Sequence, residues 1–457
     1  MVAILVAGCA VIAVAGLWLS LNYDEGVYSQ TERLVVAGQP LVSQVFSSQP
    51  PLFVATVLPG WLLGGVVGAR VMMLAWGVVA LVATYRIGRG LAGRGVAAGA
   101  TVLVAASPAF LGVTSRMQAE IPSLALALVS LALLVPRAGG ARVRGWAVAV
   151  SGALFGAALM TKLLVAPMVV PAVLLLLVAA GPVRRRVRSL VLWAGVAAVV
   201  VVGVAVPFWH GGRLYEQVVG FHVTAQDTTA GLAANLAVFR YEKVTALVLA
   251  GGVGAAMWLA GTGWRRKVSP PGPSPLAGVV LAAWVIATVG FLVIHVPLFD
   301  HHLVLAVVPA ALAVAVVVAR LPVRAAVPLA VVAALGLLAV SGQMVTTSQT
   351  LSTQSADRSI AKLRELPAGS TVITDNQVLA TLAGVSVPGQ LVDTSLVRIA
   401  SGSLTSKQVC RRIGQVDAVL LTAHGRFGQL PGVARCTRAA LRLVWSHHGD
   451  RLYRRHR

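Results

Sequence analysis

The sequence is short of charge, and above all of acid. Asp and Glu number 14 and Lys and Arg 37 among 457 residues, so that only 11% of the chain is charged while 58% is hydrophobic. Soluble domains carry about 25% charged residues, and a mean hydropathy of +0.85 therefore excludes an ordinary soluble domain. Cysteine is scarce as well, because 3 cysteines are too few for a disulfide scaffold.

The motifs of nucleotide-dependent and common hydrolytic chemistry are also missing. No Walker loop, H-E-x-x-H or G-x-S-x-G occurs. The loop GRGLAG at 88–93 has the letters of the dinucleotide fingerprint, but it joins two apolar runs and no strand precedes it. A nucleic-acid-binding domain is not indicated either, because the residues behind the net charge of +23 stand in short clusters between apolar runs.

What the sequence has instead is a series of apolar runs of roughly the length of a membrane helix, which is about 17 to 25 residues. They stand at about 2–21, 67–86, 95–114, 120–136, 145–160, 163–181, 189–209, 244–262, 276–296, 301–319 and 322–342. We therefore expect an α-helical polytopic membrane protein with about eleven transmembrane helices. The segment 51–65 is apolar but short and contains Pro59-Gly60, so we expect a break there and a helix that lies in the interface.

The basic clusters predict the orientation. With 51–65 not crossing, the Arg- and Lys-rich loops near 86–94, 137–144, 184–188, 265–267 and 320–324 all fall on one face, which the positive-inside rule makes cytoplasmic. The N-terminus is then cytoplasmic, and the localisation is the plasma or inner membrane. The acids before residue 343 all fall on the opposite, extracytoplasmic face: Asp24, Glu25, Glu32, Glu120, Glu216, Asp227, Glu242 and Asp300. This sorting favours a working site on that face.

The apolar runs stop near residue 343, which predicts two domains, 1–342 in the membrane and 343–457 as a small extracytoplasmic α/β domain. Strands are expected at 370–376, 416–422 and 441–446, with a helix at 406–414. The end, GDRLYRRHR, reads as a basic tail in contact with solvent or lipid headgroups. Cys410 and Cys436 can pair if this domain faces an oxidising compartment, and free thiols remain the alternative.

A pair of carboxylates, Asp24-Glu25, stands where the chain leaves its first apolar run. Following it are a Pro-Pro-Leu segment at 50–52, an acid in SRMQAEIP at 115–122 and a Thr-Lys pair in LMTKLLVAP at 159–167. In this order the pieces resemble the polyprenyl-phosphate sugar transferases of the GT-C membrane fold, the glycosyltransferase family 39 type. That group contains protein O-mannosyltransferases and aminoarabinose transferases. The resemblance covers about the first 210 residues.

The resemblance implies that Asp24 is the catalytic general base, that the transfer is inverting, and that Glu25 and Glu120 orient the substrates. If a divalent metal ion is used, Asp24 and Glu120 are the candidate ligands, and no other cofactor is expected. The candidates for binding the lipid phosphate or the sugar are Lys162, Arg116, Arg240, His301 and His302. Where some relatives carry Glu-Lys-Pro, this chain has Ser48-Gln49-Pro50, a departure that concerns how the phosphate is held.

The expected partners are a polyprenyl-phosphate sugar, an acceptor that is a cell-wall glycan, a lipid or a protein, and membrane lipids, with no nucleic acid. Two other classes stay open. A lipid-linked sugar flippase or transporter would place ionisable residues along a path through the membrane and often shows inverted repeats. A non-catalytic scaffold would leave Asp24 replaceable.

Overall fold

The structure, a computed structural model, describes residues 16–135, 143–179, 181–226, 231–241, 251–254, 275–319, 354–423 and 425–455 and a few single positions. Contacts divide the chain into two units. The first, which we call the bundle unit, combines 1–18, 70–204 and 230–346; the second, the outer unit, combines 19–69, 205–229 and 347–457. Helix α2 and the segment 205–229 thus group with the C-terminal residues and not with the membrane helices.

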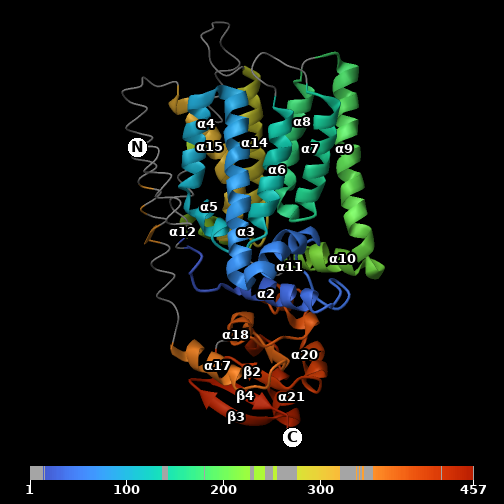
Figure 1. Cartoon of the computed structure of the whole chain (residues 1–457), viewed down its shortest axis with the longest axis vertical. Coiled ribbons are helices and arrows are strands. Elements are labelled where there is room, and N and C mark those ends of the chain that lie inside the picture. Colours follow the sequence, from blue (N-terminus) through green and yellow to red (C-terminus); the bar gives the residue numbers. More distant parts are fainter. Residues whose placement is uncertain are drawn as a thin grey trace. The chain divides into compact units, whose positions relative to one another are not determined.

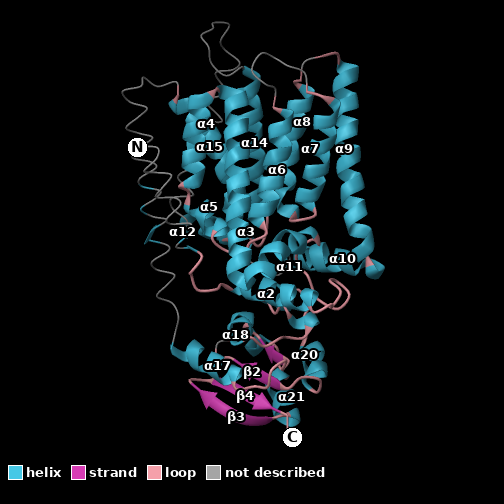
Figure 2. Cartoon of the chain, in the orientation of Figure 1, coloured by secondary structure: helices cyan, strands magenta, loops and turns pink. Residues whose placement is uncertain are grey.

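The bundle unit is helical throughout its described residues (Figure 1 and Figure 2). Its elements are α4 (Arg94–Ala105), α5 (Pro108–Thr114), α6 (Glu120–Leu134), α7 (Gly145–Leu159), the 3₁₀ turn η1 (Leu163–Met168), α8 (Val169–Leu177), α9 (Val183–Ala205), α12 (Gly231–Tyr241), α14 (Pro275–Ile294), the 3₁₀ turn η5 (Asp300–Leu303) and α15 (Val304–Val318). Helix α3 (Leu52–Ala92) begins in the outer unit and continues into this one.

Four of the described helices are long and apolar enough to cross a membrane, or five if the pair α4–α5, bent by 66°, is one span. The four are Leu52–Ala92, Val183–Phe208, Ala277–Ile294 and Asp300–Val318, and three shorter apolar helices accompany them at Glu120–Leu134, Gly145–Leu159 and Leu163–Leu177. This is a multi-pass membrane protein. The expected spans at 2–21, 244–262 and 322–342 lie largely outside the described residues.

Helix α3 corrects the expected position of a break. The helix passes through Pro59 without interruption and breaks at Gly64 and Gly65, whose backbone angles are non-helical. Gly65 has φ of 56°, a region that costs glycine nothing. Pro59 is tolerated because proline, which has no N–H, removes only one backbone hydrogen bond of the helix. The carbonyl that loses its donor can bond to neighbouring groups instead.

Small and hydroxyl-bearing residues let α6, α7 and α9 approach closely. Ser130 of α6 and Ser151 of α7 donate to each other's backbone carbonyls at 2.8 and 2.9 Å, and the indole N–H of Trp193 on α9 donates to the Ser151 hydroxyl at 3.1 Å. A Cβ on Gly152 would stand 2.3 Å from the Trp193 carbonyl oxygen. Small residues and shared polar contacts are the usual means of packing helices in lipid, and here they fix the α6–α7 pair that positions the site.

The outer unit is an α/β assembly. Its elements are α2 (Tyr23–Val36), η2 (Val206–Phe208), η3 (His210–Gly212), α10 (Arg213–Tyr215), the π-helical turn η4 (Glu216–Gly220), α11 (Phe221–Gln226), α17 (Gln354–Arg364), β1 (Val372–Thr374), α18 (Gln377–Ala383), η6 (Gly389–Leu391), α19 (Leu396–Ala400), α20 (Ser406–Ile413), β2 (Ala418–Leu421), η7 (Arg426–Gln429), α21 (Val433–Ala440), β3 (Arg442–His447) and β4 (Asp450–Arg454). The sheet order is β1-β2-β4-β3, with β1 parallel to β2 and β4 antiparallel to both its neighbours.

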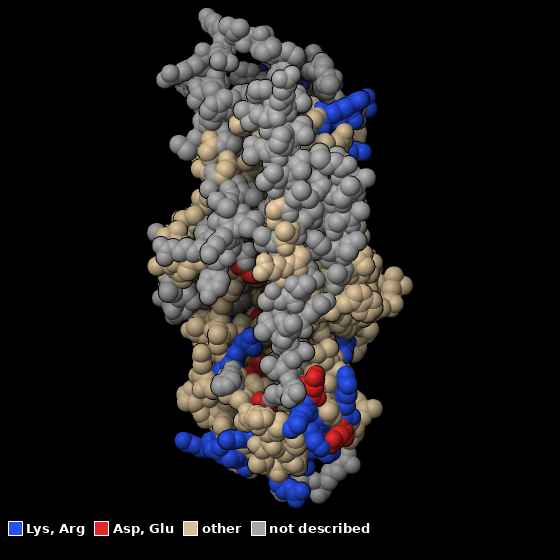
Figure 3. All heavy atoms as spheres, turned by 90° about the vertical axis from the view of Figure 1, so that its left-hand side faces the viewer, with Lys and Arg blue, Asp and Glu red and all other residues tan. Residues whose placement is uncertain are grey.

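The small α/β domain, its three expected strands and the helix between the first two of them are confirmed. The basic tail is a correction: residues 450–454 are strand β4, which fills the place between β2 and β3. Leu452 and Tyr453 are both buried although they are consecutive, and they belong to two different hydrophobic clusters, so both faces of this strand are covered despite its arginines. Figure 3 shows Lys and Arg gathered over the C-terminal residues.

Helix α2 packs against α18 of the C-terminal residues. The Gln30 amide donates to the Thr381 hydroxyl and to the Val385 carbonyl, both at 3.1 Å, and accepts from the Val387 N–H at 3.2 Å. A Cβ at position 26 would stand 2.6 Å from the Val378 backbone nitrogen, so glycine is needed there. The helix that carries Asp24 is therefore fastened to α18 and the residues after it by three of the four hydrogen bonds that a buried amide can make.

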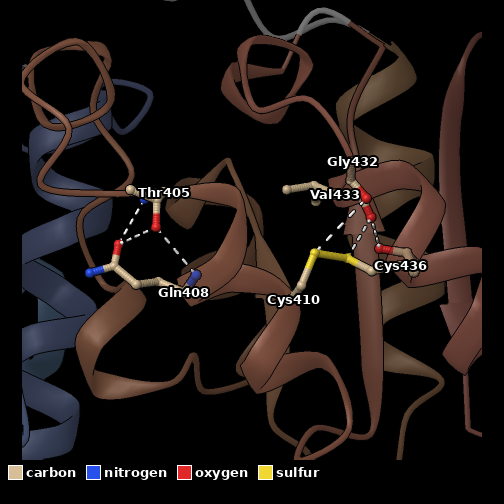
Figure 4. Close-up of a disulfide and its surroundings, with 7 residues drawn as sticks. Thr405, Gln408, Cys410, Gly432, Val433 and Cys436 are labelled. Carbon is tan, nitrogen blue, oxygen red and sulfur yellow. Dashed lines mark hydrogen bonds between the residues drawn. A yellow bond between two sulfur atoms is a disulfide. The ribbon is translucent and has the colours of Figure 1, made fainter.

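Cys410 and Cys436 form a disulfide that joins α20 to α21 (Figure 4). The bridge closes a loop of 26 residues, and for a loop of that length removal is expected to lower the free energy of unfolding of this unit by about 3 kcal/mol. Thermal unfolding of a Cys410→Ala/Cys436→Ala variant, compared with the wild-type chain under oxidising conditions, measures this. An unchanged midpoint, or equal behaviour of the wild type with and without reductant, would contradict the prediction.

Candidate functional site

Glu120 is the first residue of α6 and has a side chain that is fully buried. A carboxylate is favourable in the first turn of a helix because the unpaired N–H groups there carry partial positive charge. Lys162 follows the end of α7 in extended backbone, and the residue is buried, with an exposed fraction of 8%. Because α6 and α7 pack side by side, the Lys162 Nζ reaches Glu120 Oε1 and the two form an ion pair.

Two histidines of η5 complete the group. The Nε2 atoms of His301 and His302 lie 3.5 and 3.6 Å from Glu120 Oε1. Asp300 Oδ1 lies 3.2 Å from His301 Nδ1, and the His302 ring stands edge-on to that of His295 at 5.7 Å between centroids. Lys162, His301 and His302 thus surround Glu120. These four predicted residues come from three separate parts of the sequence. We call these four residues the Glu120 cluster.

The Glu120 cluster contains more groups that can carry a positive charge than groups that can carry a negative one. One carboxylate faces an ammonium group and two imidazoles, within helices that are otherwise apolar. Glu120 Oε2 is buried and has no hydrogen-bond partner among the described residues. Such a group of buried ionisable residues is costly in a membrane protein and typically marks a substrate site.

Glu120, His301 and His302 could also hold a metal ion, since their ligand atoms lie within 4.8 Å of one another. A carboxylate with two imidazoles suits zinc, manganese or iron. The Lys162 ammonium already neutralises one oxygen of this carboxylate, but the second oxygen remains available. The residues therefore fit a divalent ion, and they add two histidines to Glu120 as candidate ligands.

The predicted arginines are placed differently. Arg116 lies half-buried before α6 and interacts electrostatically with Asp300, at the edge of the Glu120 cluster. Arg240 belongs to α12, but its side chain lies outside the described residues.

Asp24 and Glu25 lie in the first turn of α2 in the outer unit. Asn22 and Glu25 form a capping box: the Asn22 side chain accepts from the Glu25 N–H at 2.9 Å, and the Glu25 carboxylate accepts from the Asn22 N–H at 3.2 Å. Glu25 is fully buried, whereas Asp24 is half-buried. Glu25 therefore has a structural role, because it caps the start of the helix. Asp24 lies in the same turn but takes no part in the capping box.

The residue before Asp24 is held by parts of the chain that sequence reasoning missed. The Tyr23 hydroxyl donates to Asp393 Oδ1 at 3.2 Å and accepts from the Thr394 N–H at 2.8 Å. The Arg426 guanidinium covers the Tyr23 ring at 3.6 Å and donates to the Asp375 carbonyl at 2.9 Å. No sequence signal marks this arrangement, because the partners lie about 350 residues or more from Tyr23 and each is an ordinary polar residue.

Residues 49–210 match the sequence profile of the dolichyl-phosphate-mannose-protein mannosyltransferase family. No curated relative matches the chain in sequence. The match includes Glu120 and Lys162 and ends near residue 210, where the resemblance also ends, but it begins after Asp24 and Glu25.

Solved structures with similar folds extend over nearly the whole chain. ArnT from Cupriavidus metallidurans in the apo state has a TM-score of 0.70 at 14% identity, covering 99% of this chain and 97% of that one. The same protein bound to undecaprenyl phosphate gives 0.65 at 14% identity with the same coverage. The oligosaccharyltransferase AglB from Archaeoglobus fulgidus, in complex with an inhibitory peptide and a dolichol-phosphate, gives 0.58 at 11% identity, covering 99% of this chain and 74% of that one. These likenesses confirm the resemblance, and the chain has the GT-C fold of membrane glycosyltransferases.

Proposed function

We propose that this protein is an integral membrane glycosyltransferase that moves a sugar from a polyprenyl-phosphate carrier to an acceptor hydroxyl on the extracytoplasmic face, with inversion. The observation that carries the proposal is the Glu120 cluster, in which a lysine and two histidines converge on a buried carboxylate between apolar helices. Similar folds have been solved with undecaprenyl phosphate and with a dolichol-phosphate, which supports a lipid phosphate as the ligand.

The chemistry needs no nucleotide, because the carrier phosphate is itself the leaving group. The acceptor oxygen attacks the anomeric carbon, the bond from that carbon to the phosphate oxygen breaks, and polyprenyl phosphate leaves with the electron pair. Asp24 takes the proton of the acceptor hydroxyl and so acts as general base. Attack from the face opposite the leaving group inverts the configuration.

The positive groups of the Glu120 cluster stabilise the departing phosphate. Lys162, held beforehand by Glu120, and the N–H groups of His301 and His302 donate to its oxygens, and preorganised donors of this kind contribute most where charge develops. If a divalent metal binds at Glu120, His301 and His302, it would supply further positive charge to the phosphate. Glu25 keeps the start of α2, and with it Asp24, in place.

The test is transfer of radiolabelled sugar in membranes that contain the full chain, compared with matched membranes that lack it. We expect incorporation into endogenous acceptors from polyprenyl-phosphate mannose or polyprenyl-phosphate arabinose, and none from nucleotide sugars once synthesis of the carrier is blocked. Movement of the labelled lipid across the bilayer without incorporation would instead make the protein a flippase. Equal incorporation with and without the chain would favour a scaffold.

A further inference from the structure

Glu32, on the third turn of α2, has a buried carboxyl that neither the capping box nor the Glu120 cluster uses. The residue is 1% exposed, and its Oε2 atom has no hydrogen-bond partner among the described residues. Its neighbour Gln30, by contrast, makes three hydrogen bonds to α18 and the residues after it. An unpartnered buried polar group is expensive, and natural proteins keep such groups mainly where they bind something.

Burial raises the pKa of Glu32 to about 8. No neighbouring charge contributes to this shift, and Tyr28 is the only other titratable residue among the described residues that line the space around the carboxyl. At neutral pH the group is thus a carboxylic acid with one O–H to donate and oxygens that can accept. A neutral acid without charged neighbours is suited neither to a metal cation nor to a phosphate.

The Glu32 carboxyl faces a small pocket whose walls come from α2, the segment before α3 and the start of α3. Tyr28, Phe46 and Phe53 form its apolar sides, and Ser48 and Gln49, both half-buried, stand where it approaches the surface. The Tyr28 and Phe53 rings meet edge to face at 4.6 Å, and the Gln49 amide donates to the Tyr28 hydroxyl at 3.2 Å. The walls are therefore fixed, and the space admits about one water-sized group.

We propose that this pocket, the Glu32 pocket, receives one hydroxyl group of a carbohydrate, which hydrogen-bonds to the Glu32 carboxyl. The inference rests on the proposed function, which brings sugars to this protein. A hydroxyl both donates and accepts, as a protonated carboxyl does, and it is the size of the space. Fixed aromatic walls with a few polar groups are the usual lining of small-molecule sites. The hydroxyl belongs either to the sugar of the donor or to the acceptor.

The experiment compares affinities for the purified full chain in lipid nanodiscs. The probes are bare polyprenyl phosphate, polyprenyl-phosphate mannose, polyprenyl-phosphate arabinose and the corresponding methyl glycosides, with single-deoxy versions of each sugar. We expect at least one sugar-bearing probe to bind the wild type more tightly than its control without sugar. One deoxy analogue should lose about 10- to 100-fold in affinity, because it leaves the Glu32 carboxyl unpaired.

The variants decide whether Glu32 makes this contact. Glu32→Leu should bind the parent sugar and that deoxy analogue equally, whereas Glu32→Gln, which keeps a donor and an acceptor, should still distinguish them. Glu32→Leu removes an unpartnered polar group, so folding is expected to be retained. If Glu32 had a purely structural role, the change in affinity would not be specific to one sugar hydroxyl. Preference for a lipid-linked sugar identifies the donor as the source of the hydroxyl, and preference for a methyl glycoside identifies the acceptor.

The inference would be overturned if Glu32→Leu distinguished the parent sugar from its deoxy analogue as strongly as the wild type does. It would also be overturned if no sugar-bearing probe bound the wild type more tightly than its control without sugar, in which case the pocket holds a structural water only. The proposed function fails separately, if bare polyprenyl phosphate does not bind and no transfer occurs. If the proposed function fails but the methyl glycosides still bind with an affinity that depends on Glu32, the pocket remains assigned to a sugar.

Discussion

Asp24→Asn is expected to lower the turnover of sugar transfer by about 10²- to 10⁴-fold, the usual contribution of a positioned general base. The amide has the size of the carboxyl but cannot accept the proton of the acceptor hydroxyl. The start of α2 should be unaffected, because Asn22 and Glu25 form the capping box without Asp24. The loss of an acid from the first turn costs about 0.3–1 kcal/mol at most. We therefore expect a loss in kcat with KM for the donor little changed, measured as initial rates at several donor concentrations.

Asp357→Asn is the matched control, since Asp357 also lies in the first turn of a helix, α17, but is exposed. It should transfer as the wild type does. Glu25→Gln separates chemistry from structure, because glutamine at this position can still close a capping box. Transfer by Asp24→Asn at the wild-type rate, with equal amounts of protein in the membrane, would remove Asp24 from the mechanism.

The parts of the site that could be predicted are those with a strong local cause. Ionisable residues at the ends of apolar runs are conspicuous and predict His301 and His302, whereas Glu120 and Lys162 follow from the family resemblance. That they meet at one carboxylate depends on the packing of α6 against α7 and on the η5 turn, which no local pattern encodes. The same limit explains why the two histidines were not predicted as candidate metal ligands beside Glu120.

The Glu32 pocket and the Tyr23–Arg426 contact could not be predicted, because each depends on tertiary neighbours. Glu32 in the sequence is one acid among several on a polar segment, and only the surrounding Phe46 and Phe53 make it unusual. The error over strand β4 has a related cause: its arginines indicate solvent exposure, but Leu452 packs into one hydrophobic cluster and Tyr453, on the opposite face of the strand, into another.

Lys162→Met is expected to abolish measurable transfer and to destabilise the bundle unit by about 3 to 5 kcal/mol, the usual cost of removing one partner of a buried ion pair. Methionine preserves the length and the apolar stem but leaves the Glu120 carboxylate without its ammonium partner. Thermal unfolding in nanodiscs measures the stability, and initial rates measure transfer. Lys362→Met is the matched control, because Lys362 forms an exposed ion pair with Glu365, and such pairs contribute about 0–1 kcal/mol.

The double variant Glu120→Gln/Lys162→Met distinguishes the two roles of Lys162. With both charges removed, no buried carboxylate is left without a counter-charge. The double variant should therefore regain most of the stability that Lys162→Met loses. Transfer should not return, because the phosphate still lacks its cation. If the double variant recovers transfer together with stability, Lys162 serves only to neutralise Glu120, and the lipid phosphate must be held by His301, His302 or a metal ion. If it recovers stability alone, the ion pair is the resting state of a phosphate-binding lysine.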